Sequence, residues 1–112
     1  MPEKREHSQE ILTAFDELCD DLSALPEFKR ETWFGTPAAR VWGEMCLALW
    51  GDSLVAKLGA DEVDRRSAAG EGEHFDPSGR GKRMKDWLES TAPPAEWSAL
   101  AESAVAFVAP DS

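Results

Sequence analysis

Four basic side chains lie close together in the second half of the chain. They are Arg80, Lys82, Arg83 and Lys85. Clustered arginine and lysine on a glycine-rich loop can bind phosphate or carboxylate groups. The alternative is a solvated loop whose positive charges balance nearby acidic residues, and the cluster has neither an interleaved aromatic residue nor a helix N-terminus to favour binding. A solvated loop is therefore the first interpretation of this segment and an anion site the second.

The cysteines and histidines form no recognisable catalytic or metal-binding pattern. Cys19 and Cys46 each lie in an apolar stretch outside any Cys-x-x-Cys pair, so we expect buried thiols with raised pKa values. A disulfide between them stays open, because it requires Cα atoms within about 7 Å. His7 lies in a charged stretch, and the acidic residues near His74 lack a recognised ligand spacing. We expect no catalytic residue, metal or cofactor.

Five tryptophans in a chain of 112 residues suggest either a stacking platform or core positions. Four of them occupy expected strand or helix-face positions, where burial is the commoner outcome. These are Trp42, Trp50, Trp87 and Trp97. We therefore expect them mainly in the core.

Length and charge limit the classes of function. A chain of 112 residues suits one domain, here residues 1–112 with residues 1–7 as a flexible tail. Lys and Arg number 12 and Asp and Glu 22, so the net charge is −10, which disfavours specific binding of nucleic acid. The apolar runs are too short to cross a membrane, and the charged N-terminus does not resemble a secretory signal. We expect a cytoplasmic protein.

The first predicted element is an amphipathic helix. Ile11, Phe15, Leu18 and Leu22 form one apolar face at helical spacing. Ser8 is the expected N-cap, although a start at Pro2 stays open, and Pro26 ends the helix near residue 24.

Short runs of β-favouring residues then predict a meander of antiparallel strands. The runs are Thr32 to Phe34, Arg40 to Trp42, Met45 to Trp50 and Leu54 to Leu58, separated by turns at residues 35–37, 43–44 and 51–52. Met45 to Trp50 contains no polar residue, so it is either a central strand buried on both faces or a strand that a partner covers. A single helix over Met45 to Lys57 is the alternative, which the glycine breaks disfavour.

The remaining pattern is helix, loop, strand and helix. Residues 60–69 read as a short helix with Asp61 as a cap and Gly70 as the terminator. Residues 70–83 read as a loop anchored by Phe75, in which Asp76 organises the turn. Residues 84–89 read as a strand, and residues 97–108 as a closing helix. Amphipathic helices beside antiparallel strands predict an α+β two-layer sandwich with the helices on one face of the sheet.

Two segments resemble the TfoX N-terminal domain family, small domains found alone or as the first half of bacterial competence regulators. One contains Trp33-Phe34-Gly35-Thr36-Pro37, Val41 to Ala48 and Gly51 to Leu58, which is similar to the family's Met-Phe-Gly opening, Gly-Lys hairpin and Lys-Leu strand. The other contains Phe75-Asp76-Pro77 and Arg83-Met84-Lys85-Asp86-Trp87, which is similar to its Phe-Asp-Pro loop and Met-Lys-x-Trp strand.

The resemblance covers residues 33–107 and implies a curved antiparallel sheet in an α+β two-layer fold, but no reaction. It departs from the family at Trp33, which stands for a methionine, and at Glu44, which stands for the hairpin lysine. The related YjbR-like domains share the general fold and likewise imply no activity. The matching motif residues, which we expect to be structural, are Trp33, Phe34, Gly35, Phe75, Asp76, Pro77, Met84 and Trp87.

Two functions follow as expectations. The first is a non-enzymatic cytoplasmic interaction or regulatory module, whose partner is another protein or a second copy of the chain. The second is a domain that binds a small molecule or an anion through the basic residues between Arg80 and Lys85, beside the Phe75-Asp76-Pro77 loop.

Overall fold

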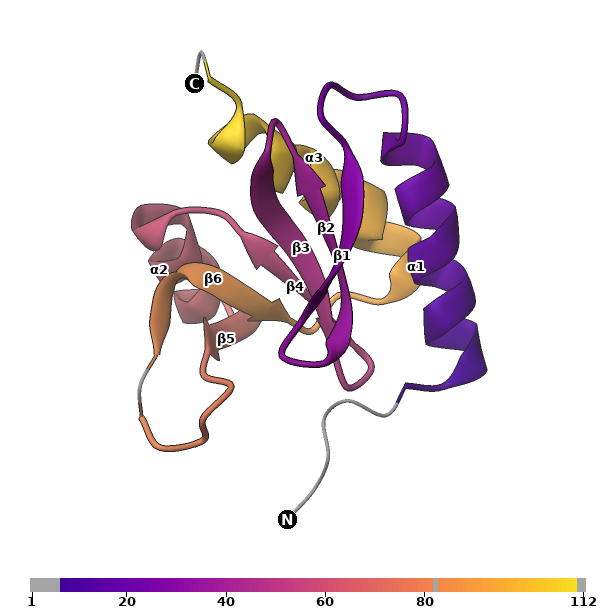
Figure 1. The fold of residues 1–112 in the computed structure, drawn as a ribbon. Helices are drawn as coiled ribbons and strands as arrows, with labels where there is room; N and C mark the ends of the chain where they lie inside the picture. The colour runs from indigo at the N-terminus through magenta and orange to yellow at the C-terminus, as the bar shows by residue number, and fades with distance from the viewer. Residues whose placement is uncertain (1–6, 82, 111–112) are drawn as a thin grey trace.

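The computed structural model describes residues 7–81 and 83–110, which form one open antiparallel sheet with helices packed on one side (Figure 1). The elements are α1 (Gln9–Leu22), β1 (Lys29–Trp33), β2 (Thr36–Val41), β3 (Glu44–Trp50), β4 (Ser53–Lys57), α2 (Ala60–Ala68), β5 (Gly72–Phe75), β6 (Met84–Ser90), a short 3-10 helix (Pro94–Glu96) and α3 (Trp97–Val108). The strand order is β1-β2-β3-β4-β6-β5. The predicted α+β two-layer fold is confirmed, and the alternative of one helix over Met45 to Lys57 is wrong. Residues 1–6 of the predicted tail, and Lys82, lie outside the described residues.

Three two-residue turns connect β1 to β4. Two of them place an aromatic residue and a glycine in the left-handed region: Phe34 and Gly35 have φ of 54° and 78°, and Trp42 and Gly43 have φ of 59° and 75°. Paired positive φ values suit tight hairpins because their twist matches that of the strands. The predicted turn at residues 35–37 is therefore shifted, since β2 already begins at Thr36.

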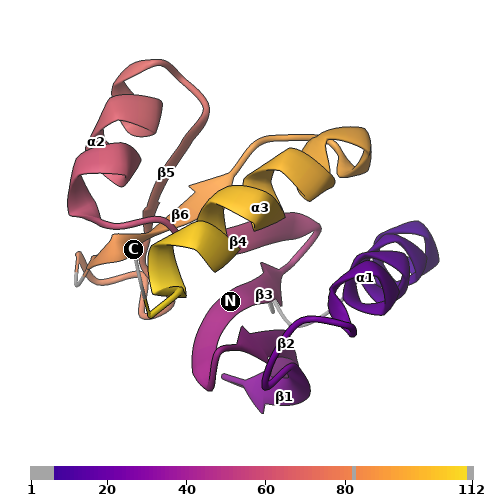
Figure 2. The same ribbon diagram turned by 90° about the horizontal axis from the view of Figure 1, so that it is seen from above.

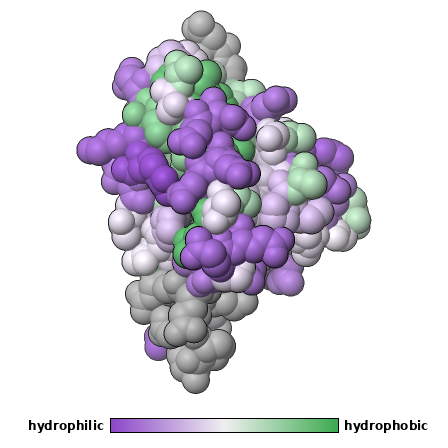
Figure 3. Space-filling view, turned by 90° about the vertical axis from the view of Figure 1, so that its right-hand side faces the viewer, coloured by the Kyte–Doolittle hydropathy of each residue, from purple (hydrophilic) through white to green (hydrophobic). Residues whose placement is uncertain are grey.

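Helix α1 begins and packs as predicted. The Ser8 side chain accepts a hydrogen bond from the Ile11 backbone nitrogen at 3.3 Å, and the ring of Phe15 is fully buried. The helix ends at Leu22, two residues before the predicted end. Ser8 and His7 also hold the helix start against the β3–β4 turn: the Ser8 nitrogen donates to Asp52 Oδ1 at 3.0 Å, and His7 Nδ1 lies 2.5 Å from the Gly51 carbonyl oxygen. The side of the molecule shown in Figure 3 is mainly hydrophilic.

The segment around α2 corrects two predictions. Gly59, and not Asp61, is the N-cap of α2, and no side chain caps it. Gly70, with φ of 80°, follows the helix end as predicted. The predicted loop over residues 70–83 contains strand β5, which pairs with β6. Gly72 permits this pairing, because a Cβ at this position would lie 2.5 Å from the Glu89 carbonyl oxygen.

Two apolar clusters fill the two faces of the sheet. The first joins residues of all three α-helices to Leu47, Leu49, Leu54, Ala56 and Leu88 of the strands. The second consists, among the described residues, of strand side chains: Ala38, Ala48, Val55, Phe75 and Trp87, with Trp33, Met45, Trp50 and Met84 against them. Figures 1 and 2 agree with this division, with α3 packed on β3 and β4 and α2 beside β5 and β6.

Strand β3 lies between these clusters. Its residues 46–49 are at most 1% exposed, and side chains of the same chain provide this burial. The prediction of a central strand buried on both faces is confirmed. The curl of the sheet, which brings aromatic side chains over the second face, provides the cover that a partner would otherwise supply.

Phe75 is the anchor that the sequence predicts, since its ring is fully buried in the second cluster. We expect Phe75→Ala to lower the free energy of unfolding by about 3–5 kcal/mol, because the lost ring leaves a cavity. Urea denaturation measures the change. The neighbouring change His74→Ala serves as the control and should cost less, because the ring of His74 is paired with the exposed carboxylate of Asp64. An unchanged midpoint for Phe75→Ala would contradict the anchor role.

Candidate functional site

Five aromatic rings from four strands and one turn meet on the second face of the sheet. We call Trp33, Phe34, Trp50, Phe75 and Trp87 the aromatic cluster. Ring centroids lie 4.5 Å apart for Trp33 and Trp87, 5.7 Å for Trp33 and Phe75, and 5.3 Å for Trp50 and Phe75. These are the separations of tilted and edge-to-face aromatic pairs.

Exposure within the aromatic cluster increases from the core outward. Phe75 and Trp87 are 0% and 6% exposed, Trp33 and Trp50 are half-buried, and Phe34 is 45% exposed. The Phe34 ring is tilted by 42° to that of Trp33, with centroids 4.8 Å apart, and meets Trp50 edge-on at 6.3 Å. The cluster therefore presents a fixed apolar surface whose outermost ring is held at positive φ, a strained conformation for a bulky residue.

Two methionines pack against the aromatic cluster, and ion pairs join strands of the same sheet. Met45 and Met84 pack against it, half-buried. On strands of the same sheet, Arg40 Nε lies 2.7 Å from Glu31 Oε2, and Lys57 Nζ lies 3.4 Å from Glu44 Oε1. Such a surface can bind apolar groups and, through the faces of its rings, cations. None of the aromatic and thioether side chains of this surface is an acid, a base or a nucleophile.

Asp76 organises the loop that follows β5, as the sequence predicts. Its Oδ1 accepts hydrogen bonds from the backbone nitrogens of Ser78 and Gly79, both at 3.1 Å, and its Oδ2 accepts one from Gly81 at 2.8 Å. The Ser78 hydroxyl and these backbone donors lower the pKa of the Asp76 carboxyl. The loop after Pro77 is thus ordered by one carboxylate.

The described residues of the predicted basic cluster do not all line the same hollow. Arg83 and Lys85 line a hollow of about 580 Å³ together with Ala60, Asp64, His74 and Gly81. Arg80 lies on the same loop but does not line the hollow, and Lys82 is outside the described residues. His74 Nε2 lies 2.8 Å from Asp64 Oδ1.

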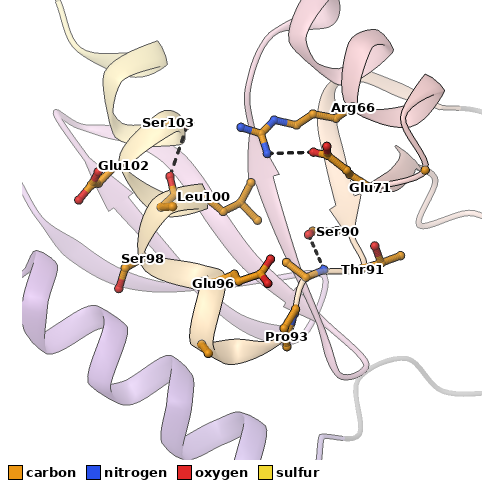
Figure 4. Close-up of a pocket in the computed structure, with 14 residues that line it drawn as sticks. Arg66, Glu71, Ser90, Thr91, Pro93, Glu96, Ser98, Leu100, Glu102 and Ser103 are labelled. Carbon is orange, nitrogen blue, oxygen red and sulfur yellow. Dashed lines mark hydrogen bonds and ion pairs between the residues drawn. The ribbon is translucent and has the colours of Figure 1, made fainter.

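A larger cleft of about 880 Å³ lies between the end of α2, the β6–α3 connection and α3 (Figure 4). The side chain of Arg66 extends from α2 into it, whereas Ser98 and Glu102 point away from Arg66. Arg66 is already bound by Glu62 at 2.6 Å and by Glu71 at 3.4 Å. Because two carboxylates neutralise its charge, this cleft is a weaker candidate for anion binding than the hollow.

The two cysteines are free and buried in the helix-side core. Burial raises the pKa of Cys19 to about 11 and that of Cys46 to about 12. Both thiols therefore stay protonated at neutral pH, in agreement with the predicted structural role.

Comparison of the chain with protein-family models, curated proteins and solved structures finds no match. Within residues 7–81 and 83–110, no group of three His, Cys, Asp or Glu side chains could hold a metal ion. No helix in the described part of the chain has the length and apolar character needed to cross a bilayer.

Both thiols should resist modification in the folded protein. We expect no reaction of Cys19 or Cys46 with a thiol reagent near pH 8, because both are buried and protonated, and reaction of both after denaturation in urea. Absorbance of the released chromophore measures the number of reactive thiols. Rapid labelling of either cysteine without urea would show that the core around it opens readily.

Proposed function

We propose that this chain is a non-enzymatic protein-interaction module that binds a basic segment of a partner protein through the aromatic cluster. The single observation that supports the proposal is that the aromatic cluster extends from Phe75, which is buried in the core, to Phe34, which is exposed at the surface. Aromatic side chains are enriched among the residues that contribute most to protein interfaces.

The rigidity of the surface supports this role. Phe75 and Trp87 fix the inner side of the cluster by burial, and a two-residue turn fixes Phe34. A surface that is ordered before binding loses little side-chain entropy when a partner contacts it. The positive φ of Phe34 is a local cost of folding, typical of positions that serve binding more than stability.

Charge supports a basic partner. The chain carries 22 acidic and 12 basic residues, so its field attracts a positively charged segment and accelerates encounter. Arginine and lysine side chains can also lie over the faces of tryptophan and phenylalanine rings. A second copy would bring the same net charge of −10, so a homodimer is the less favoured occupant. The two free buried cysteines agree with a reducing, cytoplasmic setting.

The test uses peptides of defined chemistry. We expect a short peptide of alternating arginine and leucine to bind at low salt, and its counterpart with glutamate in place of arginine not to bind. Phe34→Asn should weaken binding about tenfold or more, because it removes the outermost ring. Phe107→Ala, on α3, is the matched control for loss of a similarly exposed phenylalanine. Fluorescence anisotropy of labelled peptides measures both affinities.

Stability measurements separate lost binding from lost folding. Asparagine adopts positive φ more readily than phenylalanine, which offsets part of the lost ring contacts, so Phe34→Asn should remain folded under the conditions of the binding measurement. If Phe34→Asn binds as tightly as the wild type, the cluster is not the contact surface. A dimer in sedimentation equilibrium that Phe34→Asn dissociates would replace the basic partner by a second copy.

A further inference from the structure

The hollow beside α2 gathers positive charge in an otherwise acidic chain. Its lining comes from α2 with Ala60 and Asp64, from β5 with His74, and from the segment entering β6 with Gly81, Arg83 and Lys85. Figure 1 shows these elements side by side. Among the described lining residues, two permanent cations and one carboxylate give a formal charge of +2 − 1 = +1, counting His74 as neutral, while the chain carries −10.

We propose that this hollow binds the phosphate group of a small molecule. Arginine offers a planar fork of donors, and lysine a compact charge with three donors. A phosphate monoester has three acceptor oxygens and nearly two negative charges, so it can be contacted by several cationic side chains at once. The hollow is a separate site from the aromatic cluster, and it shares no lining residue with it.

Hydrogen bonds within the chain hold two of the lining residues, His74 and Gly81. His74 is 17% exposed and is held through Nε2 by Asp64, which leaves Nδ1 as the ring atom for a further contact. Gly81 is fixed by its backbone hydrogen bond to Asp76 Oδ2 at 2.8 Å. A preformed wall reduces the entropy lost on binding. Among the described lining residues Asp64 is the acidic one, and its bond to His74 turns it toward the imidazole.

Arg80 is a control residue for binding in the hollow. It is a cation of the same loop, only three residues from Arg83, but it does not line the hollow. If phosphate were attracted by the general charge of the loop, Arg80 would matter as much as Arg83. If phosphate enters the hollow, Arg83 and Lys85 matter and Arg80 does not.

The experiment titrates the full chain with inorganic phosphate and with glycerol phosphate, using chloride at matched ionic strength as the reference. Calorimetry gives the affinity, and the shift in melting temperature reports binding to the folded state. We expect binding with a dissociation constant in the millimolar range or tighter. Arg83→Gln and Lys85→Gln should each weaken it about tenfold, and Arg80→Gln by less than about twofold.

The outcomes are distinguishable. Binding of inorganic phosphate alone identifies free phosphate as the ligand, whereas tighter binding of glycerol phosphate identifies an organic ester. Absence of binding at about 20 mM phosphate would overturn the proposal. An equal loss from Arg80→Gln and Arg83→Gln would also overturn it, because that result indicates screening of loop charge. Melting temperatures of the variants without phosphate show that each variant is folded.

Discussion

The contact between Trp33 and Phe75 joins the two edges of the sheet, because β1 and β5 are the first and last strands in its order. In a flat sheet, strands five positions apart would be separated by about 24 Å at the usual spacing. The two ring centroids lie 5.7 Å apart. The sheet therefore curls until side chains of both edges meet, and Trp87 and Trp50 fill the space between them. The double burial of β3 depends on this curl, since the rings cover the face that no helix in the described chain reaches.

The same constraint connects folding to the proposed binding surface. Trp33 is the last residue of β1, so the turn that follows it must place Phe34 against the cluster. The tight β1–β2 turn requires positive φ at Phe34, a conformation that a bulky residue adopts at some cost. The buried Phe75 and the exposed Phe34 thus belong to the same packed aromatic cluster. The hollow near α2 depends on it less, because its walls belong to α2, β5, β6 and the Asp76 loop.

The sequence predicted the features that rest on local pattern. The spacing of apolar residues predicted α1, and Ser8 was predicted as its N-cap. Phe75 was predicted as the buried anchor of a polar segment. Strand β5 was missed, because its four residues carry no alternation and owe their conformation to pairing with β6. The approach of Trp33 to Phe75 depends on curl, which no single segment encodes. The tertiary structure also decides that Arg83 lines the hollow and Arg80 does not. The resemblance to TfoX N-terminal domains stays a prediction.

Aromatic contacts between opposite edges hold the sheet in its curled form. A double-mutant cycle on Trp33→Leu and Phe75→Leu, measured by urea denaturation, tests this role of the contacts. We expect a coupling of about 1 kcal/mol or more, as for aromatic pairs in contact. The cycle of Trp33→Leu with Phe15→Leu, which lies in the other cluster, should be additive. Additivity within about 0.5 kcal/mol for Trp33 and Phe75 would contradict the claim.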